Sequence, residues 1–249
     1  MELSIVVPCY NEARNLERLV SAFGTAIGRQ ALDEKKGVEI VLVDNGSRDD
    51  TPEVLAKLLS RSENAFARSV KVEENKGYGN GIMFGLRRSS GVFLAWTHAD
   101  MQTPPEDVLR AWIAIRSMAV PEKSLVRGLR KGRPLFDQMF TKAMGWYASI
   151  ALRSPLFDVN AQPKVFHRSL LVQMHQAPDD FTLDLYLLFL ANQLGLSVAT
   201  LEVRFDSRLA GDAKGGGSLI GKFKLSKRTL VQIRRLRKTI VSATKESIP

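Results

Sequence analysis

The sequence predicts an α/β protein with a mainly parallel central sheet flanked by helices. In the first 100 residues, short β-branched runs alternate with stretches whose apolar residues recur at helical spacing. Such alternation places helices on both faces of a parallel sheet. The 249 residues are 45% apolar and 25% charged, which suits one large domain or two small ones and excludes a disordered, collagen-like or coiled-coil chain.

The first half contains the most regular pattern. Its strands are short apolar runs, and its helices have apolar residues three or four positions apart. Ser47 is expected as the N-cap of the second helix, and Pro52 suits the first turn of that helix. In chain order we expect a strand at 4–8, a helix at 11–27, a strand at 38–43, a helix at 47–59, a strand at 67–72, a helix at 79–88 and a strand at 91–96.

The second half is less regular. The stretches 134–152 and 180–194 are expected to be amphipathic helices, each with one polar side. Neither an internal repeat nor a linker between independent domains is visible. The other expected elements are a helix at 104–118, strands at 124–128 and 196–205, a glycine-rich loop at 211–218 and a basic helix at 218–244.

Most of the net charge of +10 lies in the tail, residues 218–249, which contains nine Lys or Arg and one acid. A rough apolar stripe runs along the expected tail helix, formed by Leu219, Phe223, Leu230, Ile233 and Ile240. This pattern favours binding to an anionic membrane surface, and a helix packed on the domain is the alternative. Because the basic residues are not gathered around the expected cleft, we expect no nucleic-acid partner.

Cysteine content and hydropathy indicate a cellular location. Cys9 is the only cysteine, so we expect a reducing compartment and a small buried role for this side chain. We see no signal-peptide pattern and no apolar run near the roughly 20 residues of a membrane span. The expectation is a cytoplasmic protein associated peripherally with the inner face of the membrane.

Polar or glycine-rich motifs follow each of the first four expected strands. They are P-C-Y-N-E at 8–12, D-N-G-S-R-D at 44–49, N-K-G-Y-G-N-G at 75–81 and H-A-D-M-Q at 98–102. Ligands of parallel sheets bind beyond the carboxyl ends of the strands, so the motifs predict a shared site. The glycines fit neither G-x-G-x-x-G nor the P-loop pattern, which argues against a dinucleotide or P-loop site.

Taken together, the motifs resemble those of family 2 glycosyltransferases, which have the GT-A fold, a Rossmann-like nucleotide-diphospho-sugar transferase fold. The resemblance is strongest to the branch that transfers hexoses to polyprenyl or dolichol phosphate. That branch reads P-x-Y-N-E, V-D-D-G-S-x-D-x-T, N-x-G-x-G-x-A and D-A-D-x-Q, and the resemblance covers about residues 3–215. It implies a GT-A domain at 1–217, divided into a nucleotide-sugar half (1–103) and an acceptor half (104–217), before the basic amphipathic tail at 218–249.

The function implied by this resemblance is a metal-dependent, inverting transfer in cell-envelope glycan biosynthesis. The donor would be a UDP-, GDP- or dTDP-sugar, and the acceptor a polyprenyl phosphate or related lipid-linked molecule. The nucleotide-binding residues would be Pro8, Tyr10, Glu12, Asp44, Gly77 and Asp100. Other interpretations stay open: Asp44 could cap a helix, Tyr10 could lie in the core, and Gly77 could serve a tight turn.

Mg²⁺ or Mn²⁺ is the expected cofactor, with Asp100, Gln102 and His98 as its ligands. Asp100 is also expected to be catalytic, because a hard cation stabilises the charge that develops on the leaving nucleoside diphosphate. His98 stands where the family has the first Asp of D-A-D. This departure should weaken metal binding, and it leaves open a homologue that has lost activity.

The acceptor site is expected in the second half. The element R-L-A-G-D-A-K at 208–214 resembles R-x-x-G-x-S-K of the polyprenyl-phosphate branch. Arginine and lysine suit phosphate groups, although ordinary solvated side chains are the alternative. The residues expected to bind the acceptor or its phosphate are Arg127, Arg130, Asp158, Asn160, Gln162, Arg208 and Lys214.

The acceptor chemistry decides whether a general base is needed. A lipid phosphate is already ionised near pH 7, whereas a glycan hydroxyl must lose a proton to a carboxylate. The candidates for this base are Asp158, Asp179, Asp180 and Asp184. We expect Asp184 to be the catalytic carboxylate, and a contact with the acceptor or a charge at a helix N-terminus is the alternative. Three functions therefore remain: a lipid-phosphate transferase, a transferase to a hydroxyl of a growing surface glycan, and a non-catalytic nucleotide-sugar-binding homologue.

Overall fold

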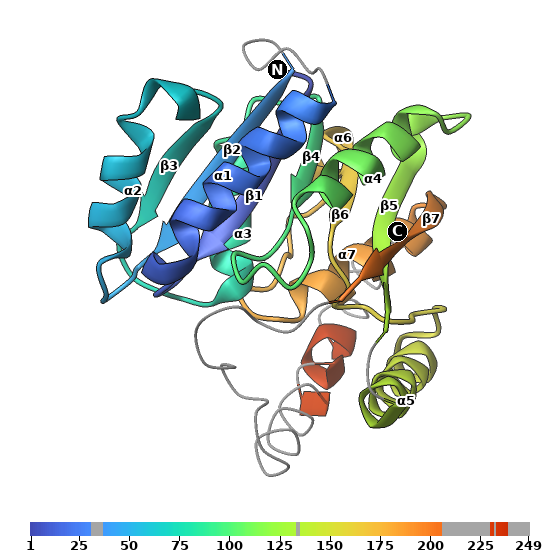
Figure 1. Cartoon of the computed structure of the whole chain (residues 1–249). Helices are drawn as coiled ribbons and strands as arrows, with labels where there is room; N and C mark the ends of the chain where they lie inside the picture. The colour runs from blue at the N-terminus through green and yellow to red at the C-terminus, as the bar shows by residue number, and fades with distance from the viewer. Residues whose placement is uncertain (31–36, 133–134, 206–229, 232, 239–249) are drawn as a thin grey trace.

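The computed structural model of this chain describes residues 1–30, 37–132, 135–205, 230–231 and 233–238. Seven strands form one sheet in the order β3-β2-β1-β4-β6-β5-β7 (Figure 1). β6 is antiparallel to both β4 and β5, whereas the other neighbouring pairs are parallel, which confirms the mainly parallel sheet. The strands are β1 (Leu3–Cys9), β2 (Val38–Asn45), β3 (Ala67–Val72), β4 (Phe93–Trp96), β5 (Ser124–Lys131), β6 (Lys164–His167) and β7 (Ser197–Arg204).

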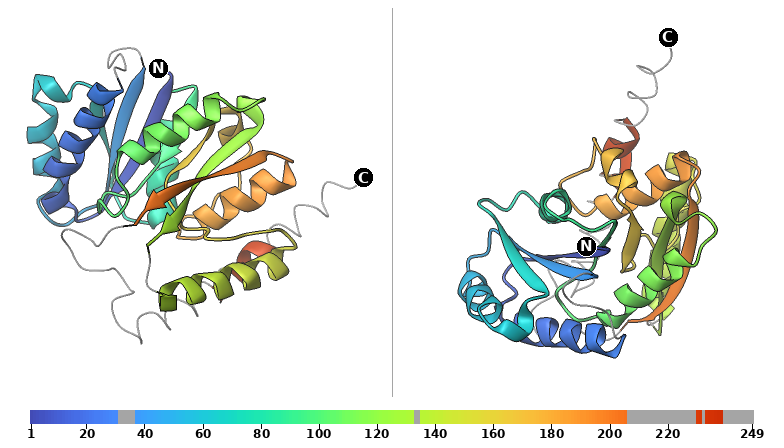
Figure 2. Two further views of the ribbon diagram at one scale, coloured as in Figure 1. Left: turned by 45° about the vertical axis from the view of Figure 1, so that its right-hand side comes forward. Right: turned by 90° about the horizontal axis from the view of Figure 1, so that it is seen from above.

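Helices cover both faces of the sheet, as the two views of Figure 2 show. Successive strand residues point to opposite faces, so Ile5 and Val7 lie in a core with α1 and α4, and Val6 lies in a second core with α3 and α7. Burial on both faces explains why these strands are continuous apolar runs. The helices are α1 (Ala13–Arg29), α2 (Thr51–Leu59), α3 (Tyr78–Arg87), α4 (Glu106–Arg116), α5 (Leu135–Leu152), α6 (Ser169–Val172) and α7 (Leu183–Gln193), with short 3-10 turns η1 (Ser62–Asn64) and η2 (Pro121–Lys123).

The carboxyl ends of β1, β2 and β4 meet at one edge because these strands are parallel. Figure 1 shows α5 and the helical residues 230–231 and 233–238 beyond this edge. Ile233 and Leu236 are buried in the same apolar cluster as Ala148 and Leu152 of α5. This pair of helices therefore covers the edge where the sequence predicted the site.

The start of α2 differs from the prediction. The helix begins at Thr51, and Ser47 lies in the turn before it. The Ser47 backbone N–H donates to the Asp44 carboxylate (3.0 Å), and the Ser47 hydroxyl, which a cap would use, accepts the Asn11 N–H (3.0 Å). Asp50 occupies the N-cap position, so the prediction of Ser47 as N-cap is wrong. Pro52 lies in the first turn, as predicted.

The second half contains an element that the sequence pattern did not reveal. β6 has only four residues, too few for a period-2 pattern, yet it pairs with β4 and β5 and joins the two halves of the sheet. α7 begins at Leu183 and not at residue 180, because the Asp180 carboxylate accepts hydrogen bonds from the Thr182 N–H and hydroxyl in a turn before the helix. Of the expected tail helix, residues 230–231 and 233–238 are helical, and the loop predicted at 211–218 lies outside the described residues.

No helix among the described residues is long and apolar enough to cross a membrane.

Glu39 joins three segments at the amino end of the sheet. Its carboxylate accepts hydrogen bonds from the Ser4 hydroxyl (2.5 Å), the Ser90 N–H (2.7 Å) and the Arg68 guanidinium (2.9 Å). Burial alone would raise the pKa of Glu39, but the hydrogen bonds from Ser4, Ser90 and Arg68 lower it from 4.5 to about 2. The charged carboxylate therefore stabilises the fold above pH 4.5, and this contribution is lost as the pH falls towards 2.

We expect Glu39→Gln to lower the free energy of unfolding at pH 7 by about 1.5–3 kcal/mol, the range for hydrogen bonds to charged groups. Urea unfolding at a series of pH values measures this. The variant should also lose less stability than the wild type between pH 4.5 and 2, because the group that titrates there is gone. A pH dependence identical to that of the wild type would contradict the role given to Glu39.

Candidate functional site

A pocket of about 580 Å³ opens at the carboxyl edge of the sheet. It is bounded by the ends of β1 and β4, the start of α3, the segment before β6, the start of α7, α5 and Ile233. Residues from distant parts of the sequence meet there, as expected for the carboxyl edge of parallel strands. Of the residues predicted for the site, eleven line this pocket: Pro8, Tyr10, Glu12, Gly77, His98, Asp100, Gln102, Arg130, Asn160, Gln162 and Asp184.

Three other predicted residues do not line the pocket. Asp44 is buried, and its carboxylate accepts the Ser47 N–H within the turn that follows β2. Arg127 donates to the carbonyl oxygens of Phe157 (2.6 Å) and Asp158 (3.2 Å). The Asp158 carboxylate pairs with Arg130, accepting from its backbone N–H at 3.0 Å and its Nε at 2.9 Å. Arg127 and Asp158 thus fix the loop before β6 and the position of the Arg130 guanidinium.

Arg208 and Lys214 lie outside the described residues.

The loops after β1 and β2 are joined by hydrogen bonds. The Asn11 N–H donates to the Ser47 hydroxyl (3.0 Å), and the Arg48 N–H donates to the Asn11 side chain (2.8 Å). The Glu12 N–H donates to the Thr51 hydroxyl (2.9 Å). These contacts order the loop that carries the predicted nucleotide-binding residues, and they come from the second motif of the sequence.

The glycine run packs closely against the segment before α7. A Cβ at Gly79 would lie 2.1 Å from the Pro178 carbonyl oxygen, and one at Gly77 would lie 2.3 Å from the Asp179 carbonyl oxygen. Gly77 also has φ of +135°, a conformation that favours glycine. Both glycines are therefore needed for close packing against this segment, and Gly77 also lines the pocket.

A network of polar side chains forms the floor of the pocket. The Tyr78 hydroxyl lies 2.9 Å from His98 Nε2 and accepts a hydrogen bond from Gln162 Nε2 (3.2 Å). Burial lowers the pKa of His98, an effect that the nearby Asp100 and Asp184 oppose. His98 is thus neutral at pH 7, and because its Nε2 is engaged by Tyr78 it could ligate a metal only through Nδ1.

At the centre of this network is a buried ion pair. Lys164 Nζ lies 3.1 Å from Asp184 Oδ1, and both side chains are almost fully buried. The same oxygen accepts hydrogen bonds from Trp96 Nε1 (3.2 Å) and Gln162 Nε2 (3.0 Å), while Lys164 also donates to the carbonyl oxygens of Val159 and Ala161. Burial lowers the pKa of Lys164, and Asp184 opposes that shift. Asp184 is therefore held in place by three donors.

Lys164 and Tyr78 were not predicted as site residues. Lys164 lies two residues after Gln162, which was predicted to bind the acceptor, and a lysine beside an apolar run was the available signal. Tyr78 lies inside the glycine run at 75–81, and only the glycines of that run were interpreted as possible site residues. Its pKa is raised well above the ordinary value by burial and by Asp184, so it is a neutral hydroxyl.

The donor atoms near Asp100 suit a cation that is shared with a ligand. Among the residues with described positions, no three His, Cys, Asp or Glu side chains form a group that could hold a metal ion. Mg²⁺ in proteins typically takes one or two carboxylates and completes its shell with substrate phosphates and water. Asp100 and Gln102 both line the pocket, and Asp100 Oδ1 accepts the Gln102 backbone N–H (3.1 Å). The turn therefore offers one side-chain carboxylate and one side-chain amide. These residues fit such a shared site.

Comparison with known proteins supports a glycosyltransferase relationship. Residues 4–119 match the model of glycosyl transferase family 2, which confirms the resemblance for this part of the chain. An undecaprenyl-phosphate 4-deoxy-4-formamido-L-arabinose transferase from Pseudomonas syringae pv. syringae is 37% identical over 108 residues, which is 43% of this chain and 31% of that protein. A dolichol-phosphate mannosyltransferase from Mycosarcoma maydis is 32% identical over 129 residues, which is 52% of this chain and 42% of that protein.

A longer alignment extends into the second half of the chain. The corresponding formamido-arabinose transferase from Yersinia enterocolitica is 26% identical over 213 residues, 86% of this chain and 62% of that protein. The alignments with these three curated relatives therefore span between 31% and 62% of the relatives' length.

Solved structures establish the fold class. Glucosyl-3-phosphoglycerate synthase from Mycobacterium tuberculosis, in complex with Mn²⁺, UDP and phosphoglyceric acid, superposes with a TM-score of 0.70 at 18% identity over 95% of this chain and 78% of that chain. The mannosyltransferase PcManGT from Pyrobaculum calidifontis, in complex with GDP-Man and Mn²⁺, superposes with a TM-score of 0.64 at 22% identity over 93% of this chain and 62% of that chain. The chain has the GT-A fold, as predicted.

Proposed function

We propose that this chain, which carries a family 2 glycosyl transferase segment on a GT-A fold, transfers a sugar from a nucleotide-sugar to a polyprenyl phosphate or related lipid-linked acceptor. One observation carries the proposal: a single pocket joins the predicted nucleotide-binding loop of β1 to Asp100 and Arg130. Transfer between two phosphate-bearing substrates requires a carboxylate that can hold a cation and a guanidinium that can bind a phosphate, both in one cavity.

The donor would lie along the first-half motifs. Pro8, Tyr10 and Glu12 line the pocket next to the ends of β1 and β4, and we assign them to the base and ribose. Solved structures with the same fold contain UDP or GDP-Man, which supports a nucleotide diphosphate at this edge. Asp44 remains a predicted base contact, although its Oδ1 already accepts the Ser47 N–H.

We assign the metal site to Asp100, with Gln102 and His98 as further predicted ligands. A divalent cation, Mg²⁺ or Mn²⁺, would stabilise the negative charge that develops on the nucleoside diphosphate as the bond to the sugar breaks. Structures with the same fold contain Mn²⁺, which supports a divalent metal. An inverting outcome is proposed from family resemblance alone.

The acceptor phosphate would approach Arg130, which lines the pocket and whose guanidinium is oriented by Asp158. Asn160 and Gln162 line the same region, and Arg208 and Lys214 remain predicted phosphate ligands. The engagement of Asp184 Oδ1 by three donors favours an acceptor that needs no general base. A phosphate acceptor needs no general base, because it is already ionised. A hydroxyl of a growing glycan is therefore the second candidate for the acceptor.

Binding of nucleotides tests the proposal directly. We expect one of UDP, GDP or dTDP to raise the unfolding temperature by about 5–10 °C at about 100 times its Kd, and only with Mn²⁺ or Mg²⁺ present. Differential scanning fluorimetry with each nucleotide, with and without metal, measures this. No shift with any nucleotide would contradict the donor site. A metal-independent shift without transfer to polyprenyl phosphate would favour a non-catalytic nucleotide-sugar-binding homologue.

The proposed place of action is the cytoplasmic face of a membrane, where a lipid-linked acceptor would be found. The curated relatives are named for undecaprenyl-phosphate and dolichol-phosphate substrates. The basic tail is proposed as a peripheral contact with anionic lipids. Its described residues, 230–231 and 233–238, are helical and include four exposed basic side chains, Arg234, Arg235, Arg237 and Lys238.

A further inference from the structure

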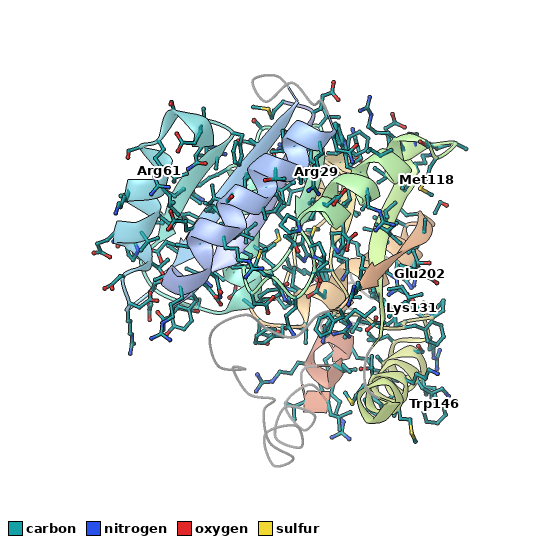
Figure 3. The ribbon with its side chains drawn as sticks, viewed as in Figure 1. Arg29, Arg61, Met118, Lys131, Trp146 and Glu202 are labelled. Atoms are coloured by element: carbon teal, nitrogen blue, oxygen red, sulfur yellow. The ribbon has the colours of Figure 1, made fainter. Side chains whose placement is uncertain are left out.

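The outward side of α5 is apolar although it is exposed. Met139 is 70% exposed, Trp146 is 66% exposed and Ile150 is 58% exposed, and the small Ala143 between them is exposed too. These four residues recur at intervals of three or four and so form one stripe, the outer face of α5. The sequence predicted an amphipathic helix here, and the side of it that is exposed in the structure is apolar. Figure 3 shows Trp146 pointing away from the rest of the molecule.

The opposite side of α5 contributes to the pocket. Thr141, Met144, Gly145 and Ala148 line the cavity described above. The helix is therefore apolar on both sides while only one side is covered by the described protein. A helix that is apolar all round is normally buried in protein or lipid. The exposed stripe thus calls for an apolar partner at the mouth of the pocket.

The charges around this stripe select the kind of partner. Lys142 is exposed on α5 and Arg153 directly follows the helix, whereas residues 139–153 contain no Asp or Glu. The adjoining residues 233–238 add four exposed basic side chains and no acid, and Arg234 Nε lies 3.4 Å from the Tyr147 hydroxyl of α5. An apolar stripe with a tryptophan, whose charged neighbours within residues 139–153 and 233–238 are all basic, complements an anionic lipid surface.

We propose that the outer face of α5 docks on an anionic lipid bilayer, with Met139, Trp146 and Ile150 entering the interface and the basic residues of α5 and 233–238 contacting the headgroups. Docking in this orientation places the pocket at the membrane surface, because the same helix lines the pocket with its other side. That consequence rests on the proposed transfer to a lipid-linked acceptor. The docking itself does not.

The three tryptophans make the docking observable. Trp96 and Trp112 are 0% and 1% exposed, so Trp146 is the tryptophan whose surroundings a membrane would change. We expect the fluorescence of the full chain to shift to shorter wavelength when vesicles of equal parts phosphatidylcholine and phosphatidylglycerol are added. Quenching of Trp146 by acrylamide should fall at the same time. Phosphatidylcholine vesicles should cause a much smaller change, because they lack the anionic charge.

Paired variants connect the signal to α5. Met139→Glu/Ile150→Glu should lower partitioning onto these vesicles by at least about tenfold, because it places two charges in the inserted stripe. The matched control is Val172→Glu: Val172 is 62% exposed on α6, at the opposite end of the sheet from α5 (Figure 1), and this variant should bind like the wild type. All three proteins should keep the same nucleotide-induced thermal shift, which separates a failure of docking from a failure of the donor site.

Three outcomes would overturn the proposal. The first is vesicle binding by the Met139→Glu/Ile150→Glu variant that equals that of the wild type. The second is protection of Trp146 from acrylamide without vesicles, which would mean that another part of the chain covers the stripe. The third is a wild-type protein that does not bind vesicles and is a dimer in analytical ultracentrifugation, while the Met139→Glu/Ile150→Glu variant is a monomer. That result would assign the stripe to a second copy of this chain.

Discussion

Asp100→Asn is expected to lower the transfer rate at least about 10²-fold, in the range found when one charge-stabilising group is removed from an active site. The substitution removes the charge that would hold the divalent cation. It leaves the turn intact, because the asparagine oxygen can still accept the Gln102 N–H. Stability without ligands should therefore stay unchanged, while the metal-dependent thermal shift with nucleotide is lost.

The measurement is kcat/KM for transfer to a polyprenyl phosphate, together with a Mn²⁺ titration. Glu74→Gln is the matched control, because Glu74 is an exposed acid next to the pocket residue Asn75 and is not predicted to bind metal. Full activity of Asp100→Asn would assign the metal role elsewhere. An equal loss of transfer rate in Asp100→Asn and Glu74→Gln would indicate that the rate depends on the total negative charge near the pocket and not on metal ligation by Asp100.

The sheet could be predicted because its signals are local. The continuous apolar runs of β1 and β2 follow from burial on both faces, and β3 has the predicted bounds. β6 could not be predicted, because its four residues acquire strand geometry only by pairing with β4 and β5. The predicted N-cap of α2 was wrong for a related reason: the Ser47 hydroxyl accepts the Asn11 N–H from the loop after β1 and does not cap the helix.

The site was partly predictable because parallel strands bring their carboxyl ends together. Placing motifs after successive strands was enough to gather Pro8, Gly77 and Asp100 in one pocket. The partners of each side chain were not predictable, since they depend on tertiary packing. Asp184 is the clearest case: the sequence offered it as a base, and the structure surrounds its Oδ1 with donors from β4, β6 and the loop before β6.

The Lys164–Asp184 pair leads to the largest expected change in stability. Lys164→Met should lower the free energy of unfolding by about 3–5 kcal/mol, because it leaves the charge of Asp184 buried without a counter-ion. Chemical denaturation at pH 7 measures this loss. For a chain of this length the unfolding temperature should fall by roughly 6–20 °C.

The double variant Lys164→Met/Asp184→Asn separates stability from chemistry. Removing both charges of a buried pair often costs little, and the asparagine oxygen can still accept from Trp96 and Gln162, so most of the stability should return. If Asp184 only positions its neighbours and the acceptor is a phosphate, transfer should return along with stability. A stable double variant without transfer would instead assign Asp184 as the general base and favour a hydroxyl acceptor. A loss below about 1 kcal/mol in Lys164→Met would show that water or a rearrangement compensates the charge, contrary to the burial of both side chains.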